Sequence, residues 1–306
     1  MTEVVAVGSA EGAVLDVVFV HGLDGNARTS WSGKREDSFW PRWVVEDIPG
    51  VAVWSVGYDA ASSKWLGHAM PIQDRAINVL AQLQNRGIGQ RPLCFVTHSM
   101  GGLLVKEMLL HSAEGRAGYR EFAAAVRGVA FLATPHTGSD LTKVVKALSV
   151  VYRATSAVED LRHNSAHLRQ LNDRYRDWVA EPGVDVAHRV FFETLPTKGV
   201  RVVDASSANP GLAGVRPIPV DDDHIGICKP ADRESVVYGQ VKLFVTGVRD
   251  SARAGTGSPA GEATAGGRRV IEGPVAGGGV TLTGTYVAGH DMWIDGAEGA
   301  RGKPRP

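Results

Sequence analysis

The chain has 306 residues, of which 43% are hydrophobic and 22% are charged, and its 33 basic and 33 acidic side chains give a formal net charge of zero. These values are ordinary for a soluble globular protein, and they allow one large domain with an appendage or two small domains. The lack of a basic excess argues against a nucleic-acid binder.

The N-terminus and the cysteines bear on targeting and compartment. The first residues lack a basic segment followed by an apolar one, so we expect no secretory signal. No stretch of about 18 apolar residues occurs, so we expect no membrane-spanning helix. The two cysteines are Cys94, in an apolar strand-like run, and Cys228. We expect a reducing, cytoplasmic compartment and no structural disulfide.

Short apolar runs alternate with helical patterns through the first half of the chain. Such runs suit strands buried on both faces of a parallel sheet, and the helical patterns suit crossover connections between them. The predicted strands are Leu15–Val20, Val51–Val56, Leu93–Val96 and Gly128–Leu132, and the predicted helices are Ile72–Gln84 and Gly102–His111.

The segment from Asp140 to Glu181 has helical spacing and no obvious strand, which predicts an inserted helical lid over about residues 137–182. Short β-rich runs then resume, and a helix is expected to end the main domain, residues 1–250. The predicted strands of this part are Arg189–Phe192, Val200–Val203 and Val215–Val220, and the final helix is Arg233–Val248.

The composition changes after Asp250. Residues 251–269 are small, polar and rich in glycine and alanine, which is typical of a flexible linker. Residues 270–295 contain β-forming residues broken by glycines, and we interpret them as a short β-prone interaction motif. We expect residues 296–306 to be a disordered tail.

An apolar strand, a tight turn and a helix meet at Ser99, in the segment LCFVTHSMGGLLVK from Leu93 to Lys106. This is the context of a nucleophile elbow, in which a serine projects its hydroxyl clear of the backbone and the helix N-terminus stabilises developing negative charge. The first position of the usual G-x-S-x-G motif is Thr97, but Gly101 and Gly102 follow the serine. We predict Ser99 as the nucleophile, against the alternative of a serine that caps an ordinary helix.

A second glycine turn, His21-Gly22-Leu23, ends the strand that begins at Leu15. Where a nucleophile elbow of this kind occurs, the loop after this strand supplies one backbone N–H to an oxyanion, and the residue after the nucleophile supplies the other. This assigns the oxyanion hole to the backbones of Leu23 and Met100. We interpret His21 as a structural residue that hydrogen-bonds beneath the loop.

The chain order expected with such an elbow is serine, then acid, then histidine. His224 is the histidine in a loop after the last predicted strand, in PIPVDDDHIGICK, and we predict it as the general base. Asp221, Asp222 and Asp223 precede it, but three adjacent carboxylates of a simple loop cannot all face one ion. We therefore expect no metal, and the chemistry implies no cofactor.

Two carboxylates compete for the role of the acid. Glu193 follows the strand-like run that ends at Phe192, where the fold expects its carboxylate. Asp204 follows Val200–Val203 and is equally placed if that run is the true seventh strand. The sequence favours Glu193 and leaves Asp204 open.

Five separated motifs occur in order: HGLDGNARTSW, RPLCFVTHSMGGLLVK, VAFLATPHTGSD, FFETLPT and DDDHIGICKP. Together they resemble the lipase-like α/β-hydrolases related to the serine active site containing protein, and more distantly the GPI inositol-deacylases, over about residues 14–248. The resemblance implies an α/β-hydrolase fold with a mostly parallel sheet, helices on both faces and a lid. It also implies a Ser–acid–His esterase or lipase acting on lipid-like esters, favours Glu193 as the acid, and places Thr134 and His136 at the pocket floor and lid root.

The segment GPVAGGGVTLTGTYVAGHDMWID resembles short glycine-punctuated motifs appended to effector domains in immune signalling, which stack as amyloid-like β-arches. The resemblance implies self-assembly or pairing with a receptor through residues 270–295, because two short β-prone segments cannot fold alone but can pair with copies of themselves.

Two functional hypotheses follow. In the first, the protein is an esterase or lipase that serves as an effector in an immune or conflict system and acts on lipid esters. Its apolar segment Leu141–Tyr152 would then touch a membrane surface transiently. In the second, it is a signalling scaffold that is recruited through residues 270–295 with little or no catalysis. Peptidases and thioesterases use the same constellation of residues.

Overall fold

A seven-stranded sheet forms the centre of the protein. The computed structural model describes residues 2–35, 37–58, 70–115, 117–136, 141–152 and 165–256. The strands follow the order β1-β3-β2-β4-β5-β6-β7, and all neighbours are parallel except β1 and β3. The strands are β1 (Glu3–Val7), β2 (Leu15–Val20), β3 (Val51–Gly57), β4 (Leu93–His98), β5 (Val126–Leu132), β6 (Ala187–Glu193) and β7 (Ile218–Val220).

The central strands are apolar because both of their faces are covered. Every residue of β2 and β4 is buried, as expected for strands of a parallel sheet between two layers of helices. The helices are α1 (Pro41–Asp47), α2 (Ile72–Asn85), α3 (Met100–Glu114), α4 (Ala117–Ala125), α5 (Leu141–Tyr152), α7 (Ser165–Val179) and α8 (Val236–Thr256), with short 3-10 turns η1 (Thr29–Trp31) and η2 (Gly226–Cys228).

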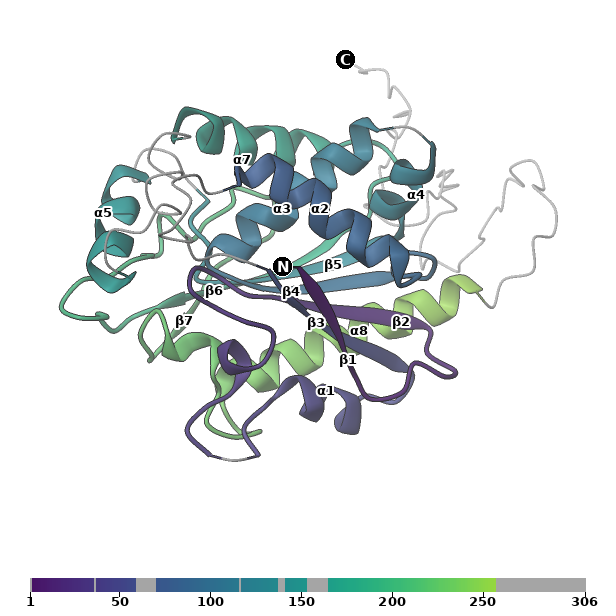
Figure 1. Ribbon diagram of the computed structural model, residues 1–306, viewed down its shortest axis with the longest axis horizontal. Coiled ribbons are helices and arrows are strands. Elements are labelled where there is room, and N and C mark those ends of the chain that lie inside the picture. Colours follow the sequence, from purple (N-terminus) through teal and green to yellow (C-terminus); the bar gives the residue numbers. More distant parts are fainter. Residues whose placement is uncertain are drawn as a thin grey trace, which may run out of the picture. The chain divides into compact units, whose positions relative to one another are not determined.

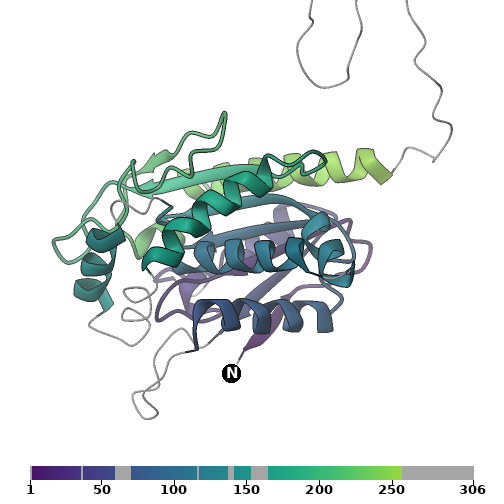
Figure 2. The ribbon, with the colours of Figure 1, turned by 90° about the horizontal axis from the view of Figure 1, so that it is seen from above.

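The helices form a layer on each face of the sheet. Figure 1 shows α1 and α8 on one face and α2, α3 and α7 on the other, and Figure 2 shows the latter three side by side, with α3 in the middle. Trp43 of α1 packs edge-on against Tyr238 of α8, whose hydroxyl donates to Asp47 at 2.8 Å. The prediction of an α/β fold with helices on both faces is confirmed.

The segment predicted as a lid contains helices of two kinds. α7 packs against α3 and buries Leu171, Tyr175 and Trp178, so it occupies the place of a crossover helix between β5 and β6. α5 contacts α7 and exposes half of the Val150 side chain. Residues 137–140 and 153–164 of the predicted lid lie outside the described residues.

Of the strands predicted after Glu193, one is wrong and the other is too long. Val200–Val203 forms no strand, because the N–H groups of Val202 and Val203 donate to the Glu193 carboxylate instead of to a neighbouring strand. The predicted strand Val215–Val220 is reduced to β7, and Pro217 and Pro219 lack the N–H groups that a longer edge strand needs. The antiparallel β1 has no counterpart among the predicted strands.

The predicted final helix begins and ends later than expected. It runs from Val236 to Thr256, past Asp250, so the first residues of the predicted linker are helical. The predictions for the rest of the linker, the motif at residues 270–295 and the tail fall outside the described residues. In the described part of the chain, no helix has the length and apolarity needed to cross a bilayer.

Candidate active site

Ser99 occupies a strained turn between β4 and α3. Its backbone has φ 50° and ψ −122°, an unusual conformation for a residue with a Cβ, of the kind that costs about 1–3 kcal/mol and clusters at functional sites. Its N–H donates to Leu132 O at 2.9 Å, and its carbonyl accepts from Gly102 N at 3.0 Å and from Thr134 Oγ1 at 3.1 Å. The turn thus has the strand–turn–helix geometry of a nucleophile elbow.

The two glycines after Ser99 are required by close packing. A Cβ on Gly101 would lie 2.3 Å from Val20 O, and a Cβ on Gly102 would lie 2.2 Å from Thr134 Oγ1. The first turn of α3 therefore lies directly against the ends of β2 and β5. Thr97 fits at the first motif position because its hydroxyl donates to Ala130 O on β5 at 3.0 Å.

The predicted nucleophile, base and acid form a continuous hydrogen-bonded chain. Ser99 Oγ lies 2.9 Å from His224 Nε2, and His224 Nδ1 lies 3.3 Å from Glu193 Oε1. All three side chains are fully buried. The three pieces of chain come from the ends of β4 and β6 and from the loop after β7.

The two candidate acids lie in different environments. Glu193 Oε1 also accepts the N–H groups of Val202 at 3.1 Å and Val203 at 2.6 Å, so the main chain holds this oxygen in place. Asp204 is exposed, and its Oδ1 accepts the N–H and the hydroxyl of Ser207 at 2.8 and 2.9 Å in a local turn. The structure brings Glu193 against the His224 ring and uses Asp204 to close that turn.

The backbones of Leu23 and Met100 flank the Ser99 turn. Gly22 passes so close that a Cβ on it would lie 2.9 Å from Ser99 Cβ, and Leu23 is the next residue. Met100 is the first residue of α3, where backbone N–H groups have no acceptor within the helix.

His21 acts beneath this loop, as predicted from the sequence. Its Nδ1 donates to Gly22 O at 2.8 Å and its Nε2 accepts the N–H of Tyr58 at 3.3 Å, which defines the tautomer. The ring stacks on Tyr58 with a centroid distance of 4.3 Å. Burial lowers the pKa of His21 to about 4, which favours the neutral ring.

The aspartates before His224 organise the loop. Asp223 Oδ1 accepts the N–H groups of Ile225 at 2.9 Å and Gly226 at 2.7 Å, so it caps the turn that leads into η2. Asp222 accepts the N–H of Asp223 at 2.8 Å. Within the described ranges, no group of three metal-ligating side chains occurs.

The helix that follows Ser99 contains a buried lysine that the sequence did not predict. Lys106 on α3 is fully buried, and its Nζ donates to Asn172 Oδ1 at 2.6 Å and lies 2.7 Å from Nδ1 of His136. Burial holds the pKa of Lys106 well below its usual range. Lysine in a helix normally indicates a solvent-facing position, so the sequence carries no signal for this cluster. The cluster ties α3 and α7 to the segment after β5 that also holds Thr134.

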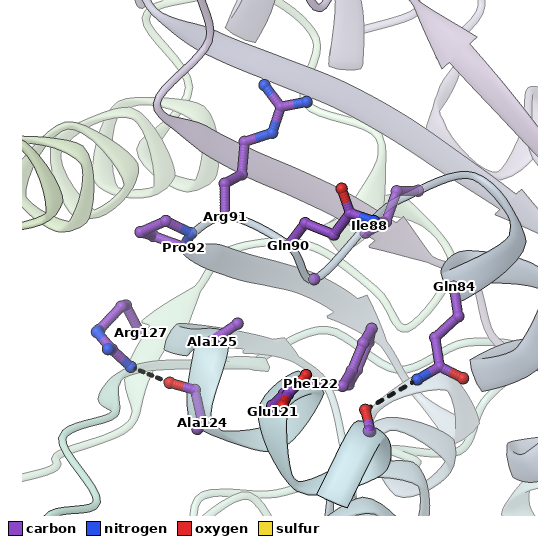
Figure 3. A pocket seen from close by; sticks show the side chains of 12 residues that line it. Gln84, Ile88, Gln90, Arg91, Pro92, Glu121, Phe122, Ala124, Ala125 and Arg127 are labelled. Atoms are coloured by element: carbon purple, nitrogen blue, oxygen red, sulfur yellow. Dashed lines mark hydrogen bonds between the residues drawn. The ribbon is translucent and has the colours of Figure 1, made fainter.

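One large surface pocket lies away from Ser99. Its volume is about 620 Å³, and it is lined by Ile88, Pro92, Phe122 and Arg127, among others (Figure 3). Pro92 and Arg127 stand at the amino ends of β4 and β5, whereas Ser99 follows the carboxyl end of β4. This pocket therefore has no part in the site at Ser99.

The chain is similar to proteins of known sequence and structure. Protein SERAC1 of Bos taurus is 32% identical in an alignment of 255 residues that covers 75% of this chain and 38% of that protein. Protein SERAC1 of Homo sapiens is 31% identical over 256 residues, with the same coverage. The chain thus spans about two fifths of the length of these relatives. A carboxylesterase structure from the thaumarchaeon Nitrososphaera gargenis matches with a TM-score of 0.53 at 12% identity, covering 82% of this chain and 96% of that one.

The sheet order, the elbow at Ser99 and the structural match define an α/β-hydrolase fold. The family model described as "Putative serine esterase (DUF676)" matches residues 14–205, and the chain belongs to this family.

Proposed function

We propose that the protein hydrolyses carboxylic esters through an acyl-enzyme, with Ser99 as nucleophile, His224 as general base and Glu193 as the acid. The observation that carries this proposal is the 2.9 Å contact between Ser99 Oγ and His224 Nε2, with Glu193 Oε1 behind the ring. A serine, an imidazole and a carboxylate in this order are the arrangement that activates a hydroxyl for acyl transfer.

In this reaction His224 Nε2 takes the Ser99 proton as the hydroxyl oxygen attacks the ester carbonyl. The oxyanion that forms accepts hydrogen bonds from the N–H groups of Leu23 and Met100, and loss of one such donor typically costs about 2.7–4 kcal/mol. His224 then gives its proton to the leaving alcohol. A water molecule, deprotonated in turn by His224, attacks the acyl-enzyme and releases the carboxylic acid and free Ser99. Throughout, Glu193 stabilises the imidazolium through Nδ1–H.

We further propose lipid-like esters as the substrates, with α5 touching the lipid surface. α5 exposes Val150 while burying Val144 and Leu148, so part of its apolar surface is available to a lipid. The activity of the variant Val150→Asp toward a long-chain ester in micelles should fall, while its activity toward a soluble short-chain ester stays at the wild-type level. Equal activity of both proteins on both substrates would contradict the role of α5.

A fluorophosphonate probe tests the central proposal, because it reacts with activated serines. The wild-type protein should be labelled at residue 99, and Ser99→Ala should lose both labelling and ester turnover. Ser112→Ala is the matched control, since Ser112 is a second buried serine, on the same side of the sheet in α3. A folded wild-type protein without labelling or turnover would instead favour the scaffold role.

A further inference from the structure

His224 belongs to an irregular loop, so side-chain contacts must hold its backbone in place. Its N–H donates to Thr197 Oγ1 at 2.9 Å. Its carbonyl oxygen lies 2.8 Å from Nε2 of His98. His98 is the last residue of β4 and is buried immediately before Ser99.

The contact with the His224 carbonyl shows which ring nitrogen of His98 carries a proton. A carbonyl oxygen can only accept a hydrogen bond, so Nε2 of His98 carries the proton and donates it. Burial and the neighbouring His224 lower the pKa of His98 to about 3, so the ring stays neutral. The centroids of the His98 and His224 rings are only 5.1 Å apart. A neutral His98 therefore matters, because a charged His98 would oppose the imidazolium that forms on His224.

Two adjacent residues of β4 and its turn thereby contact the same histidine. Ser99 Oγ lies against the Nε2 atom of its imidazole, and His98 holds its backbone carbonyl. These contacts close a small ring of bonds that includes the peptide unit between residues 98 and 99. Both contacts therefore tie His224 to the end of β4 and its turn.

We propose that His98 is a positioning residue, which holds the loop of His224 on the elbow so that Nε2 of that imidazole faces the Ser99 hydroxyl. The proposal rests on the proposed function, because it takes Ser99 and His224 as the reacting pair. Since small displacements of reacting groups carry large costs in rate, loss of the His98 hydrogen bond should lower kcat more than it raises KM.

The test compares His98→Met, which cannot donate, with His98→Gln, whose amide N–H can reach the carbonyl. With a soluble p-nitrophenyl ester, we expect His98→Met to lower kcat by about 10- to 100-fold with KM within about threefold, and His98→Gln to stay within about fivefold of the wild type. His188→Met is the matched control, because His188 is a histidine of β6 whose ring bonds Tyr175 OH at 2.8 Å without touching Ser99 or His224. We expect it to lower Tm with kcat unchanged.

Several outcomes would overturn the proposal. These are a wild-type kcat in His98→Met, an equal loss of kcat in the Met and Gln variants, or an equal loss in His188→Met. If His98→Met does not fold, His98→Asn replaces it, since its shorter amide should fail where that of Gln succeeds. Ser99→Ala is assayed in parallel: turnover that survives in Ser99→Ala contradicts the proposed function, whereas its loss together with an active His98→Met contradicts only the role of His98.

Discussion

Glu193 accepts the backbone N–H of Val203 at 2.6 Å, so the carboxylate behind His224 is held by the main chain of a segment ten residues further along the chain. The N–H of Val202 adds a second bond at 3.1 Å to the same oxygen. Two backbone donors on one oxygen fix the orientation of the carboxylate. We therefore expect Glu193 and Asp204 to differ in their effect on catalysis, and substitution of each residue tests this.

The first prediction concerns these two carboxylates. Glu193→Gln keeps the shape of the side chain but removes the charge that stabilises the imidazolium, and an amide in place of the carboxylate of a serine–histidine–acid triad costs up to about 10⁴ in kcat in the best-studied case. We expect Glu193→Gln to lower kcat by at least about 100-fold, and Asp204→Asn to leave it within about twofold. Steady-state kinetics with a soluble ester decides, and the reverse pattern would reassign the acid.

The same region shows why part of the site could not be read from the sequence. Val200–Val203 has the composition of a strand, but its N–H groups are committed to one carboxylate. β-Forming composition reports that a segment suits an extended, half-buried surface and not which acceptor its amides find. The choice between Glu193 and Asp204 depends on that acceptor, so the sequence left it open.

The elbow, by contrast, was predictable because its constraints are local. A buried apolar strand, a serine and two glycines all lie between Leu93 and Gly102, and close packing explains each glycine. Lys106 lies only two helical turns after Ser99. Its burial nevertheless depends on Asn172 and His136, which come from remote parts of the chain. Contacts between remote segments leave no periodic signal in a single sequence.

The second prediction concerns the close approach at Gly101. A Cβ there would lie 2.3 Å from Val20 O and 2.4 Å from His21 O, and backbone atoms cannot move aside as a side chain can. We expect Gly101→Ala to lower the free energy of unfolding by about 1–3 kcal/mol and to lower esterase activity. Gly247→Ala on α8 is the control, because nothing lies within 4 Å of its added methyl group, and it should raise stability by up to about 1 kcal/mol. Urea unfolding measures both, and equal effects would refute the packing argument.

The third prediction concerns the turn before His224. Asp223→Ala removes the acceptor for the N–H groups of Ile225 and Gly226, so it should cost about 0.5–2 kcal/mol and lower kcat through a looser His224 loop. Asp221→Ala removes only a contact of 3.3 Å with Thr194 Oγ1 at an exposed position and should have little effect. EDTA should not change the activity of the wild-type protein. A chelator-sensitive enzyme in which both variants are equally impaired would indicate a metal site instead.

The fourth prediction concerns stability at mildly acidic pH. Burial lowers the pKa of His21 to about 4 and of His98 to about 3, whereas both groups take up protons near pH 6.5 once the chain unfolds. The unfolded state therefore binds more protons below pH 6.5, so stability is fully present above that pH and is lost as the pH falls toward the folded-state pKa values. Each residue can contribute a loss on the order of 3 kcal/mol by pH 4. Urea titrations between pH 7.5 and 5 should show this decline, with a smaller slope in His98→Gln. An unchanged slope in that variant would show that His98 is not a source of the decline.

The fifth prediction concerns how the contribution of Lys106 to stability changes with pH. Because burial holds the pKa of Lys106 well below its usual range, the unfolded state binds more protons than the folded state up to the ordinary lysine pKa. The contribution of Lys106 to stability must therefore rise with pH, although a lost positive charge is often assumed to weaken a protein. Lys106→Met removes this titration and leaves Asn172 Oδ1 and His136 Nδ1 without their amine partner. The stability of the wild type minus that of Lys106→Met, measured by urea unfolding at pH 7, 8.5 and 10, should grow with each step, and a difference that shrinks would mean that Lys106 is charged in the folded protein.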